Sequence, residues 1–373
     1  MNLGSRIGKL SAAALLPALV SLQIACAEDE RRFHNEDEPE GPDDVAPYDF
    51  SDKGPWFECP AESEIPRGVV EVVPFNKTSQ YYGGGENLRA VEREVELPTD
   101  THWKQIGLMI RLECPADGRC DAWDRSASVA VIENPDDEER REEYEIARYI
   151  TPYGMRMCTY VDVTPFASLL TGTRTLASYI DTWVSPGHSD GSGWRVTIRL
   201  IYYPKAEPSA PEAINIWGRR NIRVGDIDTE EGTTVRSQIT PVDVAIPAHA
   251  SRVEARLLAT GHGFGNTGNC AEFCELTSHV IVNGTHFEVT PWRDDCAENP
   301  TGPQPGTWEY PRQAWCPGAF CLPNAIDVTG AIRAGEDNQI DYDIRLPSGE
   351  EYQDSSGGDW PYEMISLLLL VQR

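Results

Sequence analysis

The sequence predicts an all-β protein made of two consecutive units. Segments such as RVTIRLIYY (195–203) alternate apolar and polar residues, whereas helical periodicity is scarce. Asn283-Gly284 lies between two alternating segments and supplies the two positive-φ residues of a tight hairpin turn. The 373 residues are enough for two cores, and no internal repeat is visible. Many short strands with Gly- and Pro-rich turns favour sandwiches or jelly rolls.

The N-terminal segment has the pattern of an export signal. Arg6 and Lys9 precede an apolar run at 10–22, which is too short to cross a bilayer and suits a secretory signal. We therefore expect residues 1–27 to be a signal peptide and the protein to be secreted or periplasmic. The surroundings of Cys26 fit cleavage to a soluble product, but they also resemble a lipoprotein box, in which Cys26 would carry a lipid at the cell envelope.

The first unit is expected to follow an acidic tether. Residues 28–55 contain few apolar side chains and many carboxylates that repel one another, so we expect a disordered segment. Residues 56–205 then form the N-terminal domain. In this domain 103–114 is rich in β-forming residues, and 128–150 has the pattern of a hairpin with a polar turn.

The second unit begins after a proline-rich boundary. The segment 202–213 contains three prolines, which push the residues before them towards extended conformations, so residues 206–373 form the C-terminal domain. Residues 232–239 and 253–263 are β-like. The apolar segment 363–373 is far too short to span a membrane and predicts a buried terminal strand.

Charge and motif content exclude several function classes. The formal net charge of -28 argues against nucleic acid, because phosphate binding requires clustered Lys and Arg. No phosphate-binding loop, GxSxG elbow or zinc-ligand spacing is present, so we expect no cofactor and no metal. We expect a monomer.

The ten cysteines are expected to form disulfides, because the chain is predicted to be exported. Spacing alone does not prove connectivity. A bridge between Cys59 and Cys158 is possible and would leave Cys321 free. The close or plausible partners are Cys114 with Cys120, Cys270 with Cys274, and Cys296 with Cys316.

Three segments carry residue types suited to chemistry. Asp181 and Trp183 are two apart, so on a strand they share one face, and an acid beside an indole is a common way to hold a sugar. Asp124 and Arg125 lie beside a cysteine, where a local salt bridge in a surface turn is the simpler interpretation. The glycine-rich segment 260–274 leads to Glu272 between two cysteines, and glycines permit a ligand to approach the backbone.

Together these motifs resemble the bacterial peptide-N-glycosidase F family of peptide-N4-(N-acetyl-β-glucosaminyl)asparagine amidases. The resemblance covers about residues 108–332 and depends on several motifs in the same order. They are CDAWDR, YEIARYITPY, DVTPFASLLTG, DTW, CAEFC and RQAWCPG. It implies two adjacent eight-stranded antiparallel jelly-roll sandwich domains, with catalytic carboxylates in the cleft between them.

The resemblance also implies roles for individual residues. Asp124 matches the family's principal catalytic carboxylate, and Glu272 matches the glutamate between the paired cysteines. Arg125, Arg312 and Trp315 match further residues of the family's motifs and are expected to bind substrate. The resemblance pairs Cys296 with Cys316.

Two positions depart from the family pattern. Asp181-Thr182-Trp183 replaces Glu-Thr-Trp, so the third catalytic candidate, Asp181, reaches one methylene less far into the cleft. His262 lies in Gly261-His262-Gly263-Phe264, where the family has Trp-Gly-His. Like Trp183, His262 is assigned to substrate binding.

The resemblance implies hydrolysis of the Asn-GlcNAc amide of a glycoprotein or glycopeptide. This reaction needs a carboxylate to activate water, a donor for the carbonyl oxygen and a proton for the leaving nitrogen. We assign the base to Asp124 and the orientation of amide and water to Glu272. A glycan-binding module without catalysis and a glycoside hydrolase acting on N-glycans are the alternatives, since paired carboxylates also serve glycosidases.

Overall fold

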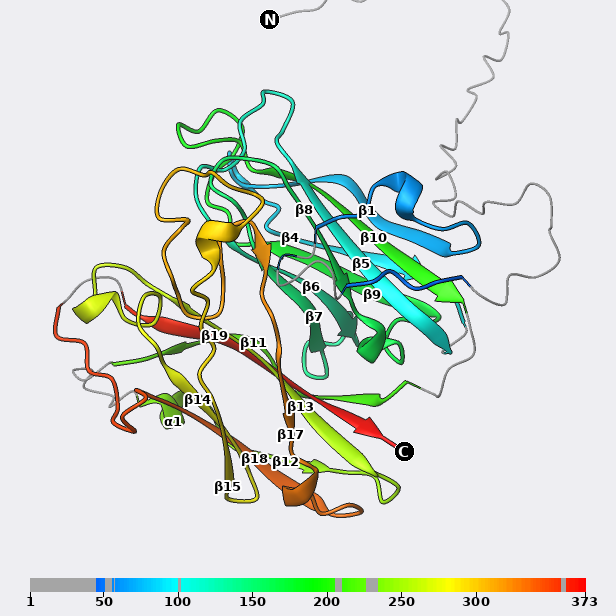
Figure 1. Cartoon of the computed structure of the whole chain (residues 1–373), viewed down its shortest axis with the longest axis vertical. Coiled ribbons are helices and arrows are strands. Elements are labelled where there is room, and N and C mark those ends of the chain that lie inside the picture. Colours follow the sequence, from blue (N-terminus) through cyan, green and yellow to red (C-terminus); the bar gives the residue numbers. More distant parts are fainter. Residues whose placement is uncertain are drawn as a thin grey trace, which may run out of the picture.

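The described residues form an all-β protein with antiparallel sheets, as predicted (Figure 1). The computed structural model describes residues 45–50, 56, 58–99, 102–204, 210–225, 234–356 and 360–373. The residues of the predicted signal peptide, including Cys26, therefore lie outside the described ranges. None of the helices in these ranges has the length and apolar character that a bilayer crossing requires.

The first half of the chain builds two facing sheets. One has the order β1-β10-β5-β8, and the other has the order β16-β7-β6-β9-β4, with β16 supplied by the second half. A separate pair, β2 and β3, forms a small hairpin. The strands are β1 (Val70–Gln80), β2 (Tyr82–Gly83), β3 (Glu86–Asn87), β4 (Ala90–Glu96), β5 (Trp103–Glu113), β6 (Ser126–Glu133), β7 (Glu142–Ile150), β8 (Met157–Asp162), β9 (Thr173–Ile180) and β10 (Trp194–Pro204).

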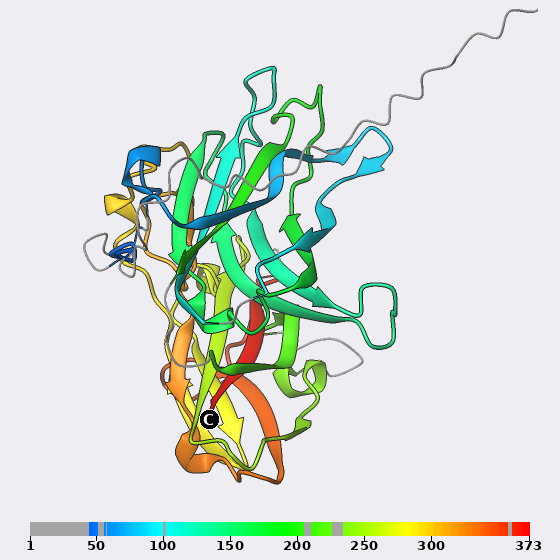
Figure 2. The ribbon, with the colours of Figure 1, turned by 90° about the vertical axis from the view of Figure 1, so that its right-hand side faces the viewer.

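The second half builds two further sheets, which lie along the long axis from the first pair (Figures 1 and 2). Their orders are β11-β19-β13-β17 and β12-β18-β14-β15. The strands are β11 (Glu212–Arg223), β12 (Val242–Ala245), β13 (Arg252–His262), β14 (Thr277–Val282), β15 (Thr285–Val289), β16 (Ala319–Phe320), β17 (Asn324–Asp327), β18 (Asp337–Arg345) and β19 (Tyr362–Gln372). Single 3-10 turns occur at Glu62–Glu64, Thr164–Phe166, Thr267–Asn269, Cys296–Glu298 and Thr329–Ala331.

The local predictions for the strands are confirmed at their strongest signals. Asn283 and Gly284 have φ of 49° and 81° and join β14 to β15. The apolar C-terminal segment forms β19, which lies between β11 and β13 and packs into the core of the second half. A strand with neighbours on both edges and little solvent exposure needs apolar residues at consecutive positions, which explains its lack of alternation.

One predicted β segment is helical. Within 232–239, the described residues form the short helix α1 (Val235–Gln238). Thr234 caps it, because the Thr234 side chain accepts a hydrogen bond from the Ser237 backbone N–H. Gln238 then bonds to both backbone polar groups of Arg223 on β11. The cap and this tertiary contact override the weak β propensity of the segment.

Part of the predicted tether is ordered against the first half. Val45 is buried, and the Tyr48 backbone N–H donates to Gln105 Oε1 at 2.8 Å. Tyr48 and Phe50 pack around Tyr160 on the outer face of the sheet. Residues 45–50 are thus not part of a disordered segment, because their aromatic side chains cover apolar surface that β5 and β8 would otherwise expose.

Polar side chains join the two halves in the interior. Arg148 on β7 is fully buried and forms an ion pair with Glu145, at 2.6 Å between Arg148 Nη2 and Glu145 Oε2. Arg148 Nη1 also donates to Thr260 Oγ1 on β13 at 3.1 Å and to the backbone carbonyl of Met364 on β19. Removing one partner of such a pair leaves an uncompensated charge, so the network fixes how β7 lies against β13 and β19.

Candidate active site

The centre of the candidate site is a buried arginine shared by two carboxylates. Arg312 Nη1 lies 3.1 Å from Glu272 Oε1 and 3.6 Å from Asp124 Oδ2. The Arg312 side chain has no exposed surface, whereas the two carboxylates retain 16% (Asp124) and 14% (Glu272). The fold therefore brings together three predicted residues that are far apart in the sequence.

Asp124 is positioned by the turn that enters β6. The buried Asp121 accepts hydrogen bonds from the Trp123 backbone N–H at 3.0 Å and from Thr182 Oγ1 at 2.7 Å. It also accepts from Arg125 Nε at 2.9 Å. Arg125 thus pairs with the buried Asp121, whereas the simpler interpretation of the motif placed Asp124 and Arg125 in a surface turn, and this ion pair holds the turn that presents Asp124.

Glu272 is positioned by the cysteine loop. Cys270 and Cys274 form a disulfide, and the Gln313 backbone N–H donates to the Glu272 carbonyl at 2.8 Å. A Cβ on Gly261 would lie only 1.6 Å from the Ala271 carbonyl oxygen. The missing side chain of Gly261 thus makes room for the backbone of the cysteine loop. The glycine-rich segment was expected to make room for a ligand.

The other disulfide predictions are also confirmed. Cys114 pairs with Cys120 before the Asp124 turn, and Cys296 pairs with Cys316 beside Trp315. The possible bridge between Cys59 and Cys158 is present, and Cys321 is a buried free thiol.

Arg312 continues into a stack of aromatic rings. Its guanidinium lies 4.4 Å from the Trp315 ring centroid, and Trp315 stacks on His262 at 5.4 Å. His262 in turn stacks on Tyr362 at 5.2 Å. Trp315 Nε1 donates to the Gly261 carbonyl at 2.7 Å, and His262 Nε2 is 2.9 Å from Thr260 Oγ1. His262 and Trp315 are thus buried supports behind Arg312.

The predicted sugar-binding pair forms a second group. Asp181 and Trp183 follow the end of β9 at Ile180, so they lie in an extended loop and not on a strand. Tyr179 Oη donates to Asp181 Oδ1 at 2.9 Å, and Arg89 Nη1 lies 3.4 Å from the same oxygen. Trp183 is 49% exposed. The expected acid and indole thus lie close together, although they are carried by a loop and not by the face of a strand.

Tyr362 connects the two groups electrostatically. The pKa of its hydroxyl is raised first by burial and then by the negative charges of Asp181 and Glu272. One phenol thus lies within the field of both carboxylates, which places the second group beside the first. Tyr362 was not predicted, because it directly precedes the apolar terminal segment 363–373 and belongs to no motif.

Burial sets the protonation of the central carboxylates. It raises the pKa of Glu272 to about 8, with repulsion from Asp124 adding to the shift and Arg312 opposing it. Burial also raises the pKa of Asp124, against hydrogen bonding from Tyr153 and the charge of Arg312. Both pKa values are raised and the two carboxyls share one arginine, so the pair retains a proton at higher pH than two exposed carboxyls would.

His262 does not act as an acid at neutral pH. Burial, together with the smaller effect of the positive charges of Arg148 and Arg312, lowers the pKa of the His262 imidazole to about 3. The ring therefore stays neutral. This fits a packing role more closely than the substrate-binding role expected from the sequence.

Tyr153 and Thr307 complete the surroundings of Asp124. The Tyr153 hydroxyl hydrogen-bonds to Asp124 and lies 3.2 Å from Thr307 Oγ1. The backbone carbonyl of Thr307 accepts from Arg312 Nη2. Neither residue was predicted. Tyr153 is the last residue of the motif YEIARYITPY, and Thr307 lies shortly before the motif that carries Arg312.

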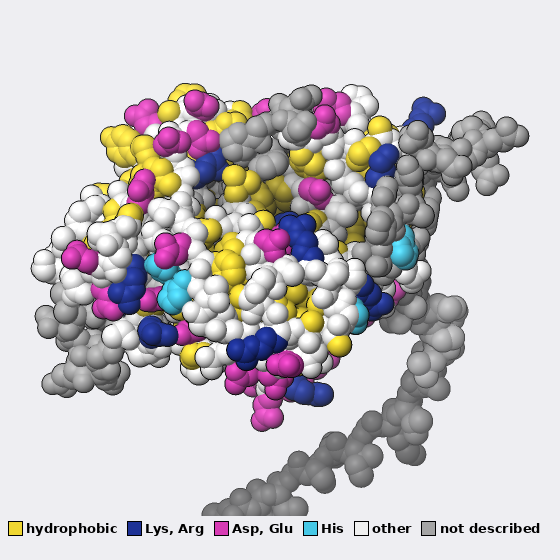
Figure 3. Space-filling view, turned by 60° about the horizontal axis from the view of Figure 1, so that its bottom comes forward, with side chains coloured by type: hydrophobic (Ala, Val, Ile, Leu, Met, Phe, Trp, Pro, Cys, Tyr) yellow, Lys and Arg dark blue, Asp and Glu magenta, His cyan; other side chains and the backbone are white. Residues whose placement is uncertain are grey.

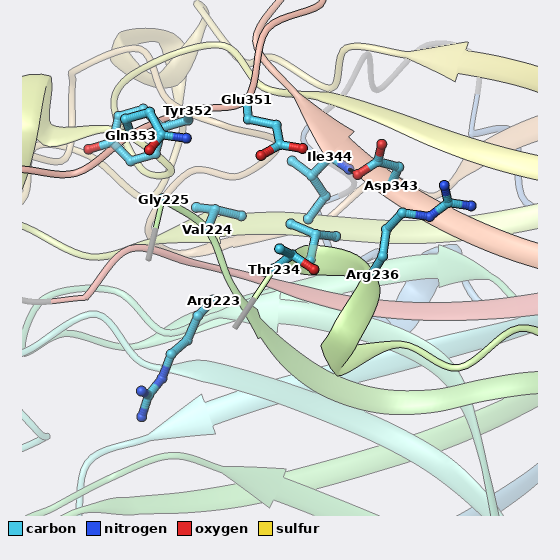
Figure 4. A pocket seen from close by; sticks show the side chains of 11 residues that line it. Arg223, Val224, Gly225, Thr234, Arg236, Asp343, Ile344, Glu351, Tyr352 and Gln353 are labelled. Carbon is cyan, nitrogen blue, oxygen red and sulfur yellow. Dashed lines mark hydrogen bonds between the residues drawn. The ribbon is translucent and has the colours of Figure 1, made fainter. Parts of the chain in front are cut away.

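A pocket lies apart from this cluster. Figure 4 shows a pocket in the second half of the chain, lined by Arg223, Gly225, Arg236, Asp343, Glu351 and Tyr352 among others. None of the predicted site residues lines it. Within the described ranges, no group of three or more His, Cys, Asp and Glu side chains is arranged to hold a metal ion.

Comparisons with known proteins point to one family. Residues 231–369 match the family model for peptide-N-glycosidase F, C terminal. The chain is 29% identical over 316 residues to the peptide-N(4)-(N-acetyl-beta-D-glucosaminyl)asparagine amidase F of Elizabethkingia miricola, covering 81% of this chain and 83% of the relative.

Solved structures show the same fold. The glycosylasparaginase PNGase F from Flavobacterium meningosepticum superposes with a TM-score of 0.68 at 23% identity, covering 82% of this chain and 96% of that one. PNGF-II superposes with a TM-score of 0.64 at 16% identity, covering 82% and 65%. By sequence and by fold, the chain is similar to the bacterial peptide-N-glycosidase F family.

Proposed function

We propose that the protein is an exported amidase that hydrolyses the bond between an asparagine side chain and N-acetylglucosamine. One observation carries the proposal: the buried Arg312 contacts both Asp124 and Glu272, which places a cation and two carboxyls at one point. The relative from Elizabethkingia miricola is named as an amidase acting on this linkage. The substrate class is therefore an N-glycoprotein or N-glycopeptide.

The geometry supports a direct hydrolytic mechanism. Asp124, as the ionised carboxylate, takes a proton from water while the water oxygen attacks the amide carbon of the substrate. Arg312 and the protonated Glu272 stabilise the negative charge that develops on the carbonyl oxygen. The carbon-nitrogen bond then breaks, and the leaving nitrogen takes a proton from Glu272 or Asp124. The products are an aspartate on the peptide and a glycosylamine.

Asp181 and Trp183 are assigned to the sugar. The exposed indole offers a flat apolar face for the sugar ring, and the carboxylate offers acceptors for its polar groups. We move Asp181 from the catalytic group to sugar binding, because Oδ1 already accepts from Tyr179 and Arg89. Three further predicted residues support the catalytic groups without contacting substrate. Arg125 does so through Asp121, and Trp315 and His262 do so by stacking next to Arg312.

We also infer the finer architecture and the cellular location. Each half of the chain contributes eight strands to its own pair of facing sheets, and each pair is interpreted as a jelly roll, with domains at 56–205 and 206–373 and a monomeric chain. The support is the antiparallel order of the sheets and the similarity in fold to PNGase F. Four disulfides fit an oxidising environment outside the cytosol. We favour a soluble product over a lipid anchor at Cys26.

The surface charge fits a neutral substrate. On the face drawn in Figure 3, Lys and Arg side chains are interspersed with Asp and Glu and form no continuous basic patch. The whole chain carries a formal net charge of -28. Such a surface offers no electrostatic attraction to a polyanion, whereas uncharged glycans are unaffected by it.

The proposal is tested by isotope incorporation. The purified protein is incubated with an Asn-glycosylated peptide in heavy-oxygen water, and the mass of the peptide product is measured by mass spectrometry. We expect the glycosylated Asn to become Asp carrying heavy oxygen, and Asp124→Asn to lower kcat roughly 10²–10⁴-fold. Asp137→Asn, in the exposed β6–β7 turn, is the matched control and should be fully active.

Two other products would refute the amidase. A peptide that still bears one N-acetylglucosamine would mean that a glycosidic bond was cut. An intact glycopeptide that binds to the protein would mean a glycan-binding module without catalysis.

A further inference from the structure

Arg89, which belongs to no motif of the sequence, lies beside the predicted sugar-binding pair. It directly precedes β4, and its backbone carbonyl accepts from the Ile180 N–H at 2.9 Å and from Gln80 Nε2 at 2.7 Å. Ile180 is the last residue of β9, so Asp181 is the next residue along the chain. The backbone of Arg89 is thereby fixed against the segment that carries Asp181 and Trp183.

The guanidinium of Arg89 is held on several sides. Nε donates to Asn87 Oδ1 at 3.0 Å, and Nη1 lies 3.4 Å from Asp181 Oδ1. The Arg89 Cζ atom lies 4.3 Å from the ring centroid of Trp183 and 4.5 Å from that of Tyr82. We name Arg89, Tyr82, Asp181 and Trp183 the Arg89 clamp.

The small β2–β3 hairpin brings Tyr82 into the clamp. The Tyr82 backbone N–H donates to the Val184 carbonyl at 2.8 Å, which ties the hairpin to the segment that carries Trp183. The rings of Tyr82 and Trp183 meet edge to face at 5.1 Å and 69°. Trp183 is therefore held by a guanidinium and by a second ring, while about half of its surface stays open to solvent.

The clamp has two physical consequences for a bound sugar. A half-exposed indole that is free to change rotamer loses entropy on binding, and a stacked cation removes that freedom beforehand. The short side chain of Asp181 would otherwise move in water, since it is 31% exposed. Arg89 and Tyr179 fix one of its oxygens, which fixes the direction of the other.

We propose that Arg89 is a positioning residue for the sugar: it holds Asp181 and Trp183 as a rigid binding face. This inference rests on the proposed function for its choice of ligand. Because Arg89 contacts neither Asp124 nor Glu272 in any interaction described above, it acts on substrate affinity and leaves the chemical step unchanged.

The test compares Arg89→Ala and Arg89→Lys with Arg93→Ala, which replaces an exposed arginine on β4, the strand that Arg89 precedes. Binding of a peptide carrying Asn-linked N,N′-diacetylchitobiose is titrated calorimetrically in an Asp124→Asn background, and kcat and KM are measured without that background. We expect Arg89→Ala to raise Kd and KM about fivefold to tenfold, with kcat within twofold. Arg93→Ala should change neither quantity.

The lysine variant separates stacking from charge. Lys keeps the positive charge but lacks the planar group that stacks between two rings while contacting a carboxylate, so it should restore less than half of the lost affinity. Asp181→Asn breaks the ion pair from the other side and should weaken binding even if Arg89→Ala folds poorly. Thermal unfolding of each variant shows whether it is folded.

Two outcomes would overturn the clamp. One is an unchanged Kd and KM in both Arg89→Ala and Asp181→Asn, and the other is a loss of kcat at constant KM. The titration does not require turnover. If the parent protein binds the glycopeptide without cleaving it, and Arg89→Ala weakens that binding, the amidase proposal fails while the clamp stands.

Discussion

Replacing Arg312 should move the pH dependence of the reaction in a defined direction. Its charge favours the ionised forms of both Asp124 and Glu272, so it lowers the pKa of each carboxyl. In Arg312→Gln this effect is lost and both pKa values rise. Since the proposed base must be ionised, the acidic limb of kcat/KM should move to higher pH.

The size of this shift follows from the distances. Two unit charges 3.6 Å apart, as for Arg312 Nη1 and Asp124 Oδ2, interact with about 4–5 kcal/mol at an effective dielectric constant of about 20. At about 1.4 kcal/mol per pH unit this allows at most about three units. Opposite charges at this range usually shift a carboxyl by about one to three units, so we expect that displacement of the limb.

The assay is kcat/KM on a glycopeptide between pH 4 and pH 10. The position of the limb does not depend on how much activity survives, so a weak variant is still informative. Arg312→Lys keeps the charge and should leave the limb within about half a unit of the parent. Because the Arg312 side chain is fully buried, thermal unfolding must first show that each variant is folded.

A limb that stays in place in Arg312→Gln would refute the reasoning. It would mean that Asp124 is not the titrating base or that Arg312 does not act on its charge. A limb that moves to lower pH would contradict the sign of the argument.

Two further predictions concern stability. With an unfolded pKa of 4.5 and a folded pKa of about 8, Glu272 contributes stability that is full below pH 4.5 and is lost as pH rises through 8. The free energy of unfolding in urea should therefore fall less steeply between pH 5 and pH 9 in Glu272→Gln than in the parent, and the two falls should differ by at most about 5 kcal/mol. If the two free energies fell in parallel, Glu272 would titrate normally. Removing the Cys270–Cys274 disulfide should lower the free energy of unfolding by only about 2 kcal/mol but should also lower kcat. Removing the Cys59–Cys158 disulfide, which closes a loop of 99 residues, should lower the free energy of unfolding by about 4–5 kcal/mol and leave kcat unchanged. Equal losses of kcat in the two variants would show that the short loop does not position Glu272.

The chain by itself determined the features that depend on neighbouring residues. Asn283-Gly284 fixed a hairpin, because its positive φ angles are needed whatever surrounds it. The ordered motifs around Asp124, Glu272 and Arg312 indicated the family before any geometry was known. Local signals were insufficient at 232–239, where a threonine cap and contacts with β11 produced a helix.

Only the tertiary structure decided which groups meet. Arg125 and Arg312 are both candidate cations in the sequence, yet Arg125 pairs with Asp121 and Arg312 with the two carboxylates. Arg89 and Tyr362 belong to no motif, and they join the site only because β9 ends, and β4 and β19 begin, beside it. The physical reason is that pairing and pKa depend on distance and burial in three dimensions, which packing sets and residue order does not.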